Sequence, residues 1–172
     1  MRTHVGNKKL EDHRFENLPW SDVLMEIVRR EGKSDWELLK KILVGKICTF
    51  PSCLITIDYL RNNIANESHR TIELEKTLFV KALELVESVP YESLFNRYRT
   101  LWIFCFKYEH FKEAAGISEK VAELEFADDF IEFLDEVTKD PRAYIFQGKS
   151  LPLLGKYRGC IYLCKSLIKR KQ

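Results

Sequence analysis

The stretch YESLFNRYRTLWIFCFKYEHFKEAAGISEKVAEL, residues 91–124, decides the fold of this chain. Apolar and aromatic side chains recur every three or four positions over residues 91–107, and this period predicts an amphipathic helix. A short turn over residues 108–110 interrupts the pattern, and a second helical pattern with several small side chains covers residues 111–124. Because a short connection brings two helices together as antiparallel neighbours, the stretch predicts a helical hairpin.

Aromatic side chains lie on nearly all sides of the first helix of this hairpin, and four of them are Phe95, Tyr98, Trp102 and Phe106. One interpretation is that they stack on RNA bases beside Arg97 and Arg99. The other is that they pack in a core, and aromatic residues around most of a helix are more typical of burial. We therefore expect a core helix here.

The rest of the chain repeats this arrangement of helices with short connections. We expect further helices over about 19–30, 34–45, 51–64, 70–89 and 126–138, and a closing hairpin over 141–172 with its turn at Leu154-Gly155-Lys156. A Ser-Asp-Trp-Glu capping box over residues 34–37 marks one helix start. Residues 55–57 are β-branched and favour a strand, but Pro51 and Ser52 favour a helix start. About eight helices predict an all-α fold.

The length bounds the number of domains. A chain of 172 residues with an apolar fraction of 45% suits one domain with its own core. Residues 1–18 carry no useful period, so we expect a flexible N-terminal arm there. We expect a single all-helical domain over residues 19–172, with N-terminal helices over 19–90 and hairpins over 91–172.

Charge is distributed unevenly along the second half of the chain. Residues 109–140 contain eleven acidic and three basic side chains, whereas residues 141–172 contain eight basic and no acidic side chains. One interpretation is that the two segments are solvated or attract each other within the fold. The other is that the basic C-terminal segment presents a positive surface to an acidic partner.

Cysteine usage and hydropathy bear on the compartment. The five cysteines are an odd number, and four of them lie in apolar helical patterns, which favours reduced thiols and a reducing compartment. No apolar run approaches the roughly 18 residues that span a bilayer. We expect a cytoplasmic or nuclear protein with no membrane partner.

No motif for catalysis or metal binding stands out. Cys48 and Cys53 lie close together, but zinc needs two more ligands at suitable spacing, and His69 and His110 are isolated. Neither a glycine-rich phosphate loop nor a serine nucleophile elbow is present. We therefore expect a protein that is not an enzyme and that has no cofactor and no metal.

Two segments share a spacing of large, small and aromatic side chains. In the closing segment these positions are Tyr144, Gln147, Gly148, Leu151, Cys160 and Cys164, and in the earlier one they are Tyr98, Leu101, Trp102, Cys105, Ala114 and Ser118. Over residues 95–126 and 141–172 the chain thus resembles the tetratricopeptide repeat family, whose repeats are helix pairs stacked into a superhelix. The resemblance implies antiparallel helical hairpins stacked as a short α-solenoid.

The chain departs from the family pattern in two respects. Trp102 stands where the pattern has a small residue, and its ring is expected to hold the paired helices apart. The segments also start 46 residues apart, whereas the family period is about 34, so the acidic helix over 126–138 is expected to be an insertion. The alternative is a helical bundle that matches the pattern by chance.

The resemblance implies a non-enzymatic adaptor or scaffold subunit that binds another protein along the first helix of each repeat. The implied partner-binding residues are Asn96, Arg99, Ile103, Phe106 and Lys107 in one segment, and Arg142, Ile145, Lys149 and Leu153 in the other. Cations mixed with apolar side chains suit an acidic peptide or helix with apolar anchors. The alternative function is RNA binding, in which Arg142, Lys149, Arg158 and the basic tail contact phosphates.

Overall fold

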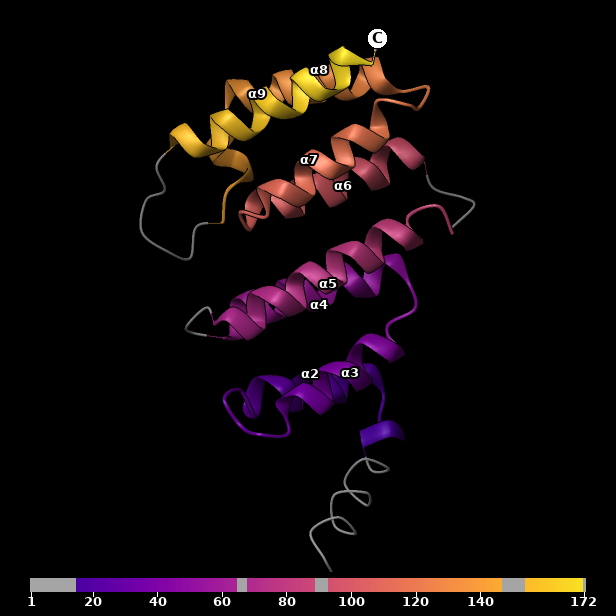
Figure 1. The fold of residues 1–172 in the computed structure, drawn as a ribbon, viewed down its shortest axis with the longest axis vertical. Coiled ribbons are helices and arrows are strands. Elements are labelled where there is room, and N and C mark those ends of the chain that lie inside the picture. The colour runs from indigo at the N-terminus through magenta and orange to yellow at the C-terminus, as the bar shows by residue number, and fades with distance from the viewer. Residues whose placement is uncertain (1–14, 65–67, 89–92, 147–153, 172) are drawn as a thin grey trace, which may run out of the picture. The chain divides into compact units, whose positions relative to one another are not determined.

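The computed structural model describes residues 15–64, 68–88, 93–146 and 154–171, and the chain divides into two compact units, Met1–Leu78 and Phe79–Gln172 (Figure 1). The helices are α2 (Trp20–Arg29), α3 (Trp36–Lys46), α4 (Phe50–Asn63), α5 (His69–Leu85), α6 (Leu94–Lys107), α7 (Phe111–Val121), α8 (Ala127–Lys139), the 3-10 helix η1 (Pro141–Tyr144) and α9 (Leu154–Arg170). No strand occurs within these described ranges. The predicted all-α fold is confirmed.

The first unit begins with the packed pair α2 and α3. One apolar stripe of α2 is buried, and the indole Nε1 of the fully buried Trp36 donates to the carbonyl oxygen of Ile27 at 3.1 Å. Gly32 follows α2 with φ +86°, a left-handed conformation that glycine adopts without strain, and α2 ends close to the predicted residue 30. The indole contact then fixes α3 against the end of α2.

The predicted capping box over residues 34–37 does not form. Asp35 occupies the cap position of α3 without a side-chain bond to the helix, and its carboxylate accepts a hydrogen bond from the Arg30 guanidinium instead. A charge-assisted bond to a guanidinium is stronger than a neutral cap, which explains the difference. The Asp35 carboxylate therefore joins the ends of α2 and α3 and does not cap its own helix.

Sequence analysis predicted a flexible arm over residues 1–18, and the structure describes only residues 15–18 of it. Phe15 is 1% exposed, and the guanidinium of Arg30 lies 5.3 Å from its ring centroid. Phe15 thus belongs to the core of the first unit. A single apolar residue in a charged stretch has no period that would reveal its burial.

The segment that favoured both a strand and a helix is helix α4. Thr49 caps it, because the backbone N–H of Ser52 donates to Thr49 Oγ1 at 3.2 Å, and Pro51 lies in the first turn. Such a cap contributes about 1 kcal/mol to helix stability. The helix start outweighs the β-branched side chains, and Thr56 and Ile57 become fully buried.

A buried ion pair joins α4 to α5. The Arg61 guanidinium donates to Glu75 through two bonds, from Nε to Oε2 at 3.0 Å and from Nη2 to Oε1 at 2.5 Å. The Glu75 side chain is 0% exposed and that of Arg61 is 6% exposed. Two parallel bonds from one guanidinium orient the carboxylate as well as neutralising it.

In the second unit, α6 and α7 form the hairpin that residues 91–124 predicted (Figure 1). Glu109 turns the chain with φ +64°, and the N–H of His110 donates to the carbonyl oxygen of Cys105 at 2.7 Å. The predicted turn is confirmed. The hairpin is closed by backbone geometry rather than by a glycine.

Trp102 does not hold the paired helices apart, contrary to the sequence expectation. Its ring is fully buried, stacks on Phe106 at 4.9 Å and meets the edge of Phe133 in α8 at 5.6 Å. Its Nε1 lies 3.4 Å from Cys164 Sγ in α9. The indole therefore joins α6 to the last two helices, while α6 still packs on α7.

Helices α8 and α9 pack as a pair, α9 also packs on α7, and α8 also contacts α6. The acidic helix is thus the first member of the last pair and not an insertion. The predicted closing hairpin is corrected as well, because its expected turn at Leu154-Gly155-Lys156 is the first turn of α9. Gly155 is exposed there, and a helix end tolerates glycine better than a helix interior does.

The expected first helix of that closing hairpin has a different structure. Pro141–Tyr144 make one short 3-10 turn, Ile145 is extended with φ −106° and ψ 143°, and residues 147–153 lie outside the described part. The N–H of Phe146 donates to the carbonyl oxygen of Lys107 at 3.4 Å. Residues 141–146 therefore lead from the end of α8 to the end of α6.

Candidate partner-binding face on α8 and α9

The residues predicted to bind a partner are distributed over several environments. Phe106 is fully buried and Ile145 is 8% exposed, so both belong to the core. Asn96 and Arg142 are exposed, while Lys149 and Leu153 lie outside the described residues. Arg142 lies in the 3-10 helix η1 and Ile145 follows it in an extended conformation, so these two do not share an α-helical stripe.

The remaining predicted residues are half-buried on α6: Arg99, Ile103 and Lys107. The Arg99 guanidinium lies over the rings of Phe95 and Phe133, at 5.7 and 5.9 Å. The Lys107 ammonium lies 5.2 Å from the ring centroid of Tyr108. These cations contact aromatic side chains of their own fold, which leaves less of each available to a partner.

The period of buried residues in α9 indicates a different candidate interaction face. Five side chains along one face of the helix are buried against the neighbouring helices: Tyr157, Cys160, Ile161, Cys164 and Ile168. On the other side of α9, Tyr162 is 76% exposed and Leu163 is 45% exposed. Large apolar side chains on the solvent side of an amphipathic helix are candidates for an interaction surface.

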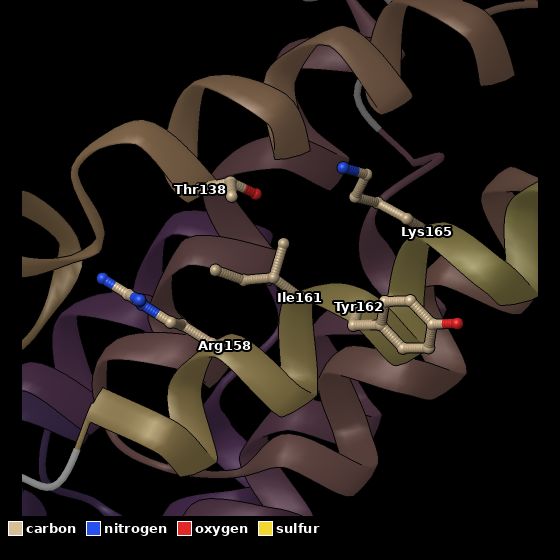
Figure 2. Close-up of a pocket in the computed structure, with 5 residues that line it drawn as sticks. All are labelled: Thr138, Arg158, Ile161, Tyr162 and Lys165. Carbon is tan, nitrogen blue, oxygen red and sulfur yellow. The ribbon is translucent and has the colours of Figure 1, made fainter.

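An open pocket of about 380 Å³ lies between the outer sides of α8 and α9. It is lined by Thr138, Arg158, Ile161, Tyr162 and Lys165. Figure 2 shows Ile161 directed across the pocket toward Thr138 of α8, while the Tyr162 ring points away from it. The pocket thus has an apolar floor, two basic side chains at its sides and an aromatic ring standing beside it.

Three ion pairs connect the basic segment to the acidic one. Lys165 lies 2.5 Å from Asp135, Lys171 lies 3.2 Å from Glu123, and Lys156 pairs with Glu109. The interpretation that the two charged segments attract each other is confirmed for these residues. Such partly exposed pairs stabilise the fold only slightly, by about 0–1 kcal/mol each.

Part of the basic charge stays uncompensated on α9. Arg158, Lys169 and Arg170 are exposed and form no ion pair with any residue that the structure describes. Arg158 and Lys169 lie on the same side of the helix as Tyr162, at spacings of four and seven residues from it. A positive stripe therefore flanks the exposed tyrosine.

The buried thiols form a cluster on the opposite side of α9. Burial raises the pKa of the Cys105 thiol, and a hydrogen bond to Cys164 together with burial raises that of Cys160. The Cys164 sulfur accepts hydrogen bonds from Cys160 and Trp102, which lower its pKa to about 7. Cys164 is 0% exposed, so its sulfur has no access to a substrate in this structure.

The described residues offer few other candidate sites. Within the described ranges, no group of three or more histidine, cysteine or acidic side chains is arranged to hold a metal ion. Among the described helices, none combines the length and the apolar composition that a bilayer crossing requires. The α8–α9 face, defined by the pocket residues with Leu163 and Lys169, is therefore the candidate site with the clearest geometry.

Comparison with protein-family models, with curated proteins and with solved structures finds no match to this chain. The resemblance to tetratricopeptide repeats consequently stays a prediction.

Sequence reasoning named only the basic residues of the α8–α9 face, Arg158 and the tail that contains Lys165 and Lys169, and it missed the others. The signal was present in the helical period, since Tyr162 and Leu163 fall outside the apolar stripe of α9. These two positions can be assigned to the outer side of α9 once the helix is known to begin at Leu154. Thr138 carries no such signal, because its place depends on how α8 aligns with α9.

Proposed function

We propose that this chain is a non-enzymatic adaptor or scaffold subunit of the tetratricopeptide-like kind. It binds an acidic helix or peptide with apolar anchors along α9. The observation that carries this proposal is the exposed pair Tyr162 and Leu163. It stands beside an apolar-floored pocket and between Arg158 and Lys169, which pair with no acidic residue in the described part of the chain. Tyrosine and arginine are the side chains most enriched where proteins bind each other.

Each part of the α8–α9 face has a role in this binding. An apolar anchor of the partner enters the pocket and contacts Ile161, and its desolvation supplies affinity. Carboxylates beside the anchor pair with Arg158 and Lys169, which orient the partner and speed its association. The exposed Tyr162 ring, which points away from the pocket, contacts the partner beside the anchor.

A protein partner is favoured over RNA by the charges around this face. The exposed carboxylates of α8, among them Glu132 and Asp135, lie beside the basic stripe of α9. A phosphate backbone that followed α9 would approach these carboxylates, and like charges repel. The five reduced cysteines support a cytoplasmic or nuclear location for the adaptor.

Charge reversal on α9 tests the proposal. The probe is a fluorescein-labelled amphipathic helical peptide with glutamates on one face and leucines on the other. Wild-type protein is expected to bind it, and R158E/K169E is expected to bind it at least about tenfold more weakly, because attraction becomes repulsion. Fluorescence anisotropy measures both dissociation constants.

The matched control is K112E/K120E. It makes the same change in net charge on exposed positions of α7 in the same unit, and it is expected to bind the probe like wild type. Equal losses in the two variants would show that only net charge matters. No binding of the probe to wild type would rule the proposed surface out.

A further inference from the structure

The α8–α9 face carries two parallel stripes of opposite charge. On α8, Asp128, Glu132 and Asp135 recur at spacings of four and three residues and are exposed. On α9, Arg158, Tyr162, Lys165 and Lys169 recur at spacings of four, three and four residues. The bond from Lys165 to Asp135, and the presence of Thr138 in the same pocket, place the two stripes side by side.

This arrangement constrains what covers the whole face. A purely acidic partner is attracted by α9 but repelled by α8. A purely basic partner is attracted by α8 but repelled by α9. Full complementarity needs a surface with the same two stripes in exchanged order. A second copy of this chain presents such a surface.

Only one kind of two-fold pairing exchanges the stripes. An axis parallel to the helices brings α8 of each copy over α9 of the other, so that acidic and basic stripes meet twice. An axis across the helices, within the plane of contact, brings α8 over α8 and α9 over α9, and the charges repel. Two-fold symmetric contacts are the commonest contacts in protein assemblies, and they require a surface that is complementary to itself. The α8–α9 face meets this requirement when the axis runs parallel to the helices.

Shape supports the same pairing. Tyr162 is 76% exposed and directed away from the pocket that it borders, so its own copy does not fill that pocket (Figure 2). In a two-fold pair, each copy supplies one projecting tyrosine and one open pocket with Ile161 at its floor. The ring of one copy is thus available to the pocket of the other.

We propose that the acidic helix bound along α9 is α8 of a second copy, and that the α8–α9 face forms a symmetric homodimer. This inference rests on the proposed function, since it names the occupant of the same surface. Such a dimer is bivalent, because each of its two copies still exposes every surface that lies outside the contact.

Paired charge reversals test this inference on the full-length chain. Sedimentation velocity over a concentration series is expected to show wild type passing from monomer to dimer. R158E/K169E alone, and D128K/E132K alone, are each expected to dimerise at least about tenfold more weakly. An equimolar mixture of the two variants is expected to regain a dimer, because each reversed α9 then meets a reversed α8.

A variant at the tyrosine tests the contact without charge changes. Y162S is expected to weaken dimerisation by about tenfold or more, whereas M25S, at a similarly exposed apolar position on α2, leaves it unchanged. Circular dichroism of every variant verifies that it is folded. If a charge-reversed variant fails to fold, the wild-type and Y162S measurements still decide the question.

The outcomes separate the two proposals. Wild type that stays monomeric up to its solubility limit overturns the homodimer, and binding of the acidic probe peptide in that case leaves the proposed function standing. Wild type that neither dimerises nor binds the probe overturns both. If folded Y162S and each folded charge-reversed variant on its own dimerise like wild type, the dimer forms through another surface, and this result also overturns the inference.

Discussion

Replacing Glu75 with alanine is expected to lower the free energy of unfolding of the first unit by about 3–5 kcal/mol. The substitution leaves the guanidinium of Arg61 buried between α4 and α5 without the carboxylate that accepts its two bonds. A buried guanidinium that loses its carboxylate recovers less of the cost of leaving water, and this loss exceeds that of a surface ion pair. Urea unfolding followed by circular dichroism measures the change.

The matched control removes both charges. R61M/E75L replaces the ion pair with apolar side chains of similar size, and it is expected to be within about 1–2 kcal/mol of wild type. If the double variant is as unstable as E75A, the loss comes from packing and not from removing the carboxylate beside Arg61. That result would contradict our account of the Arg61–Glu75 pair.

Replacing Trp102 with alanine is expected to destabilise the second unit by about 3–5 kcal/mol. The substitution opens a cavity where the indole now contacts Phe106, Phe133 and Cys164, and three helices lose a shared contact. The near-ultraviolet circular dichroism of the aromatic cluster is expected to weaken together with the urea midpoint.

W102F is the graded control for this prediction. Phenylalanine keeps most of the ring contacts but loses the N–H that points at Cys164, so a smaller loss of about 1–2 kcal/mol is expected. Equal stability of W102A and wild type would mean that the surrounding aromatic residues close the cavity. The indole would then not be the element that joins α6 to α8 and α9.

The helices and the α6–α7 hairpin were predictable because their signals are local. The period of three to four residues over 91–107 and the short turn after it depend only on neighbouring residues, and the structure confirms both. The strand that residues 55–57 favoured was outweighed by an equally local signal at Thr49 and Pro51. Local patterns of this kind fix helix positions well.

The pairing of the last helices was not predictable, for the opposite reason. Leu154-Gly155-Lys156 has the composition of a turn, yet it opens α9, because the packing of α9 on α7 and α8 outweighs the weak helix propensity of one glycine. The pocket then requires Thr138 to face Ile161, and that alignment is set by contacts between helices. The candidate face was therefore hidden until the pairing was known.

One exposed thiol has a practical consequence. Of the five cysteines, Cys48 is exposed, while Cys53, Cys105, Cys160 and Cys164 are buried. A maleimide dye consequently has a single ready attachment point, just before the cap of α4, in the unit that does not contain the α8–α9 face. Fluorescent tracking of assembly is thus open to the unaltered chain, with no engineered label on the surface under study.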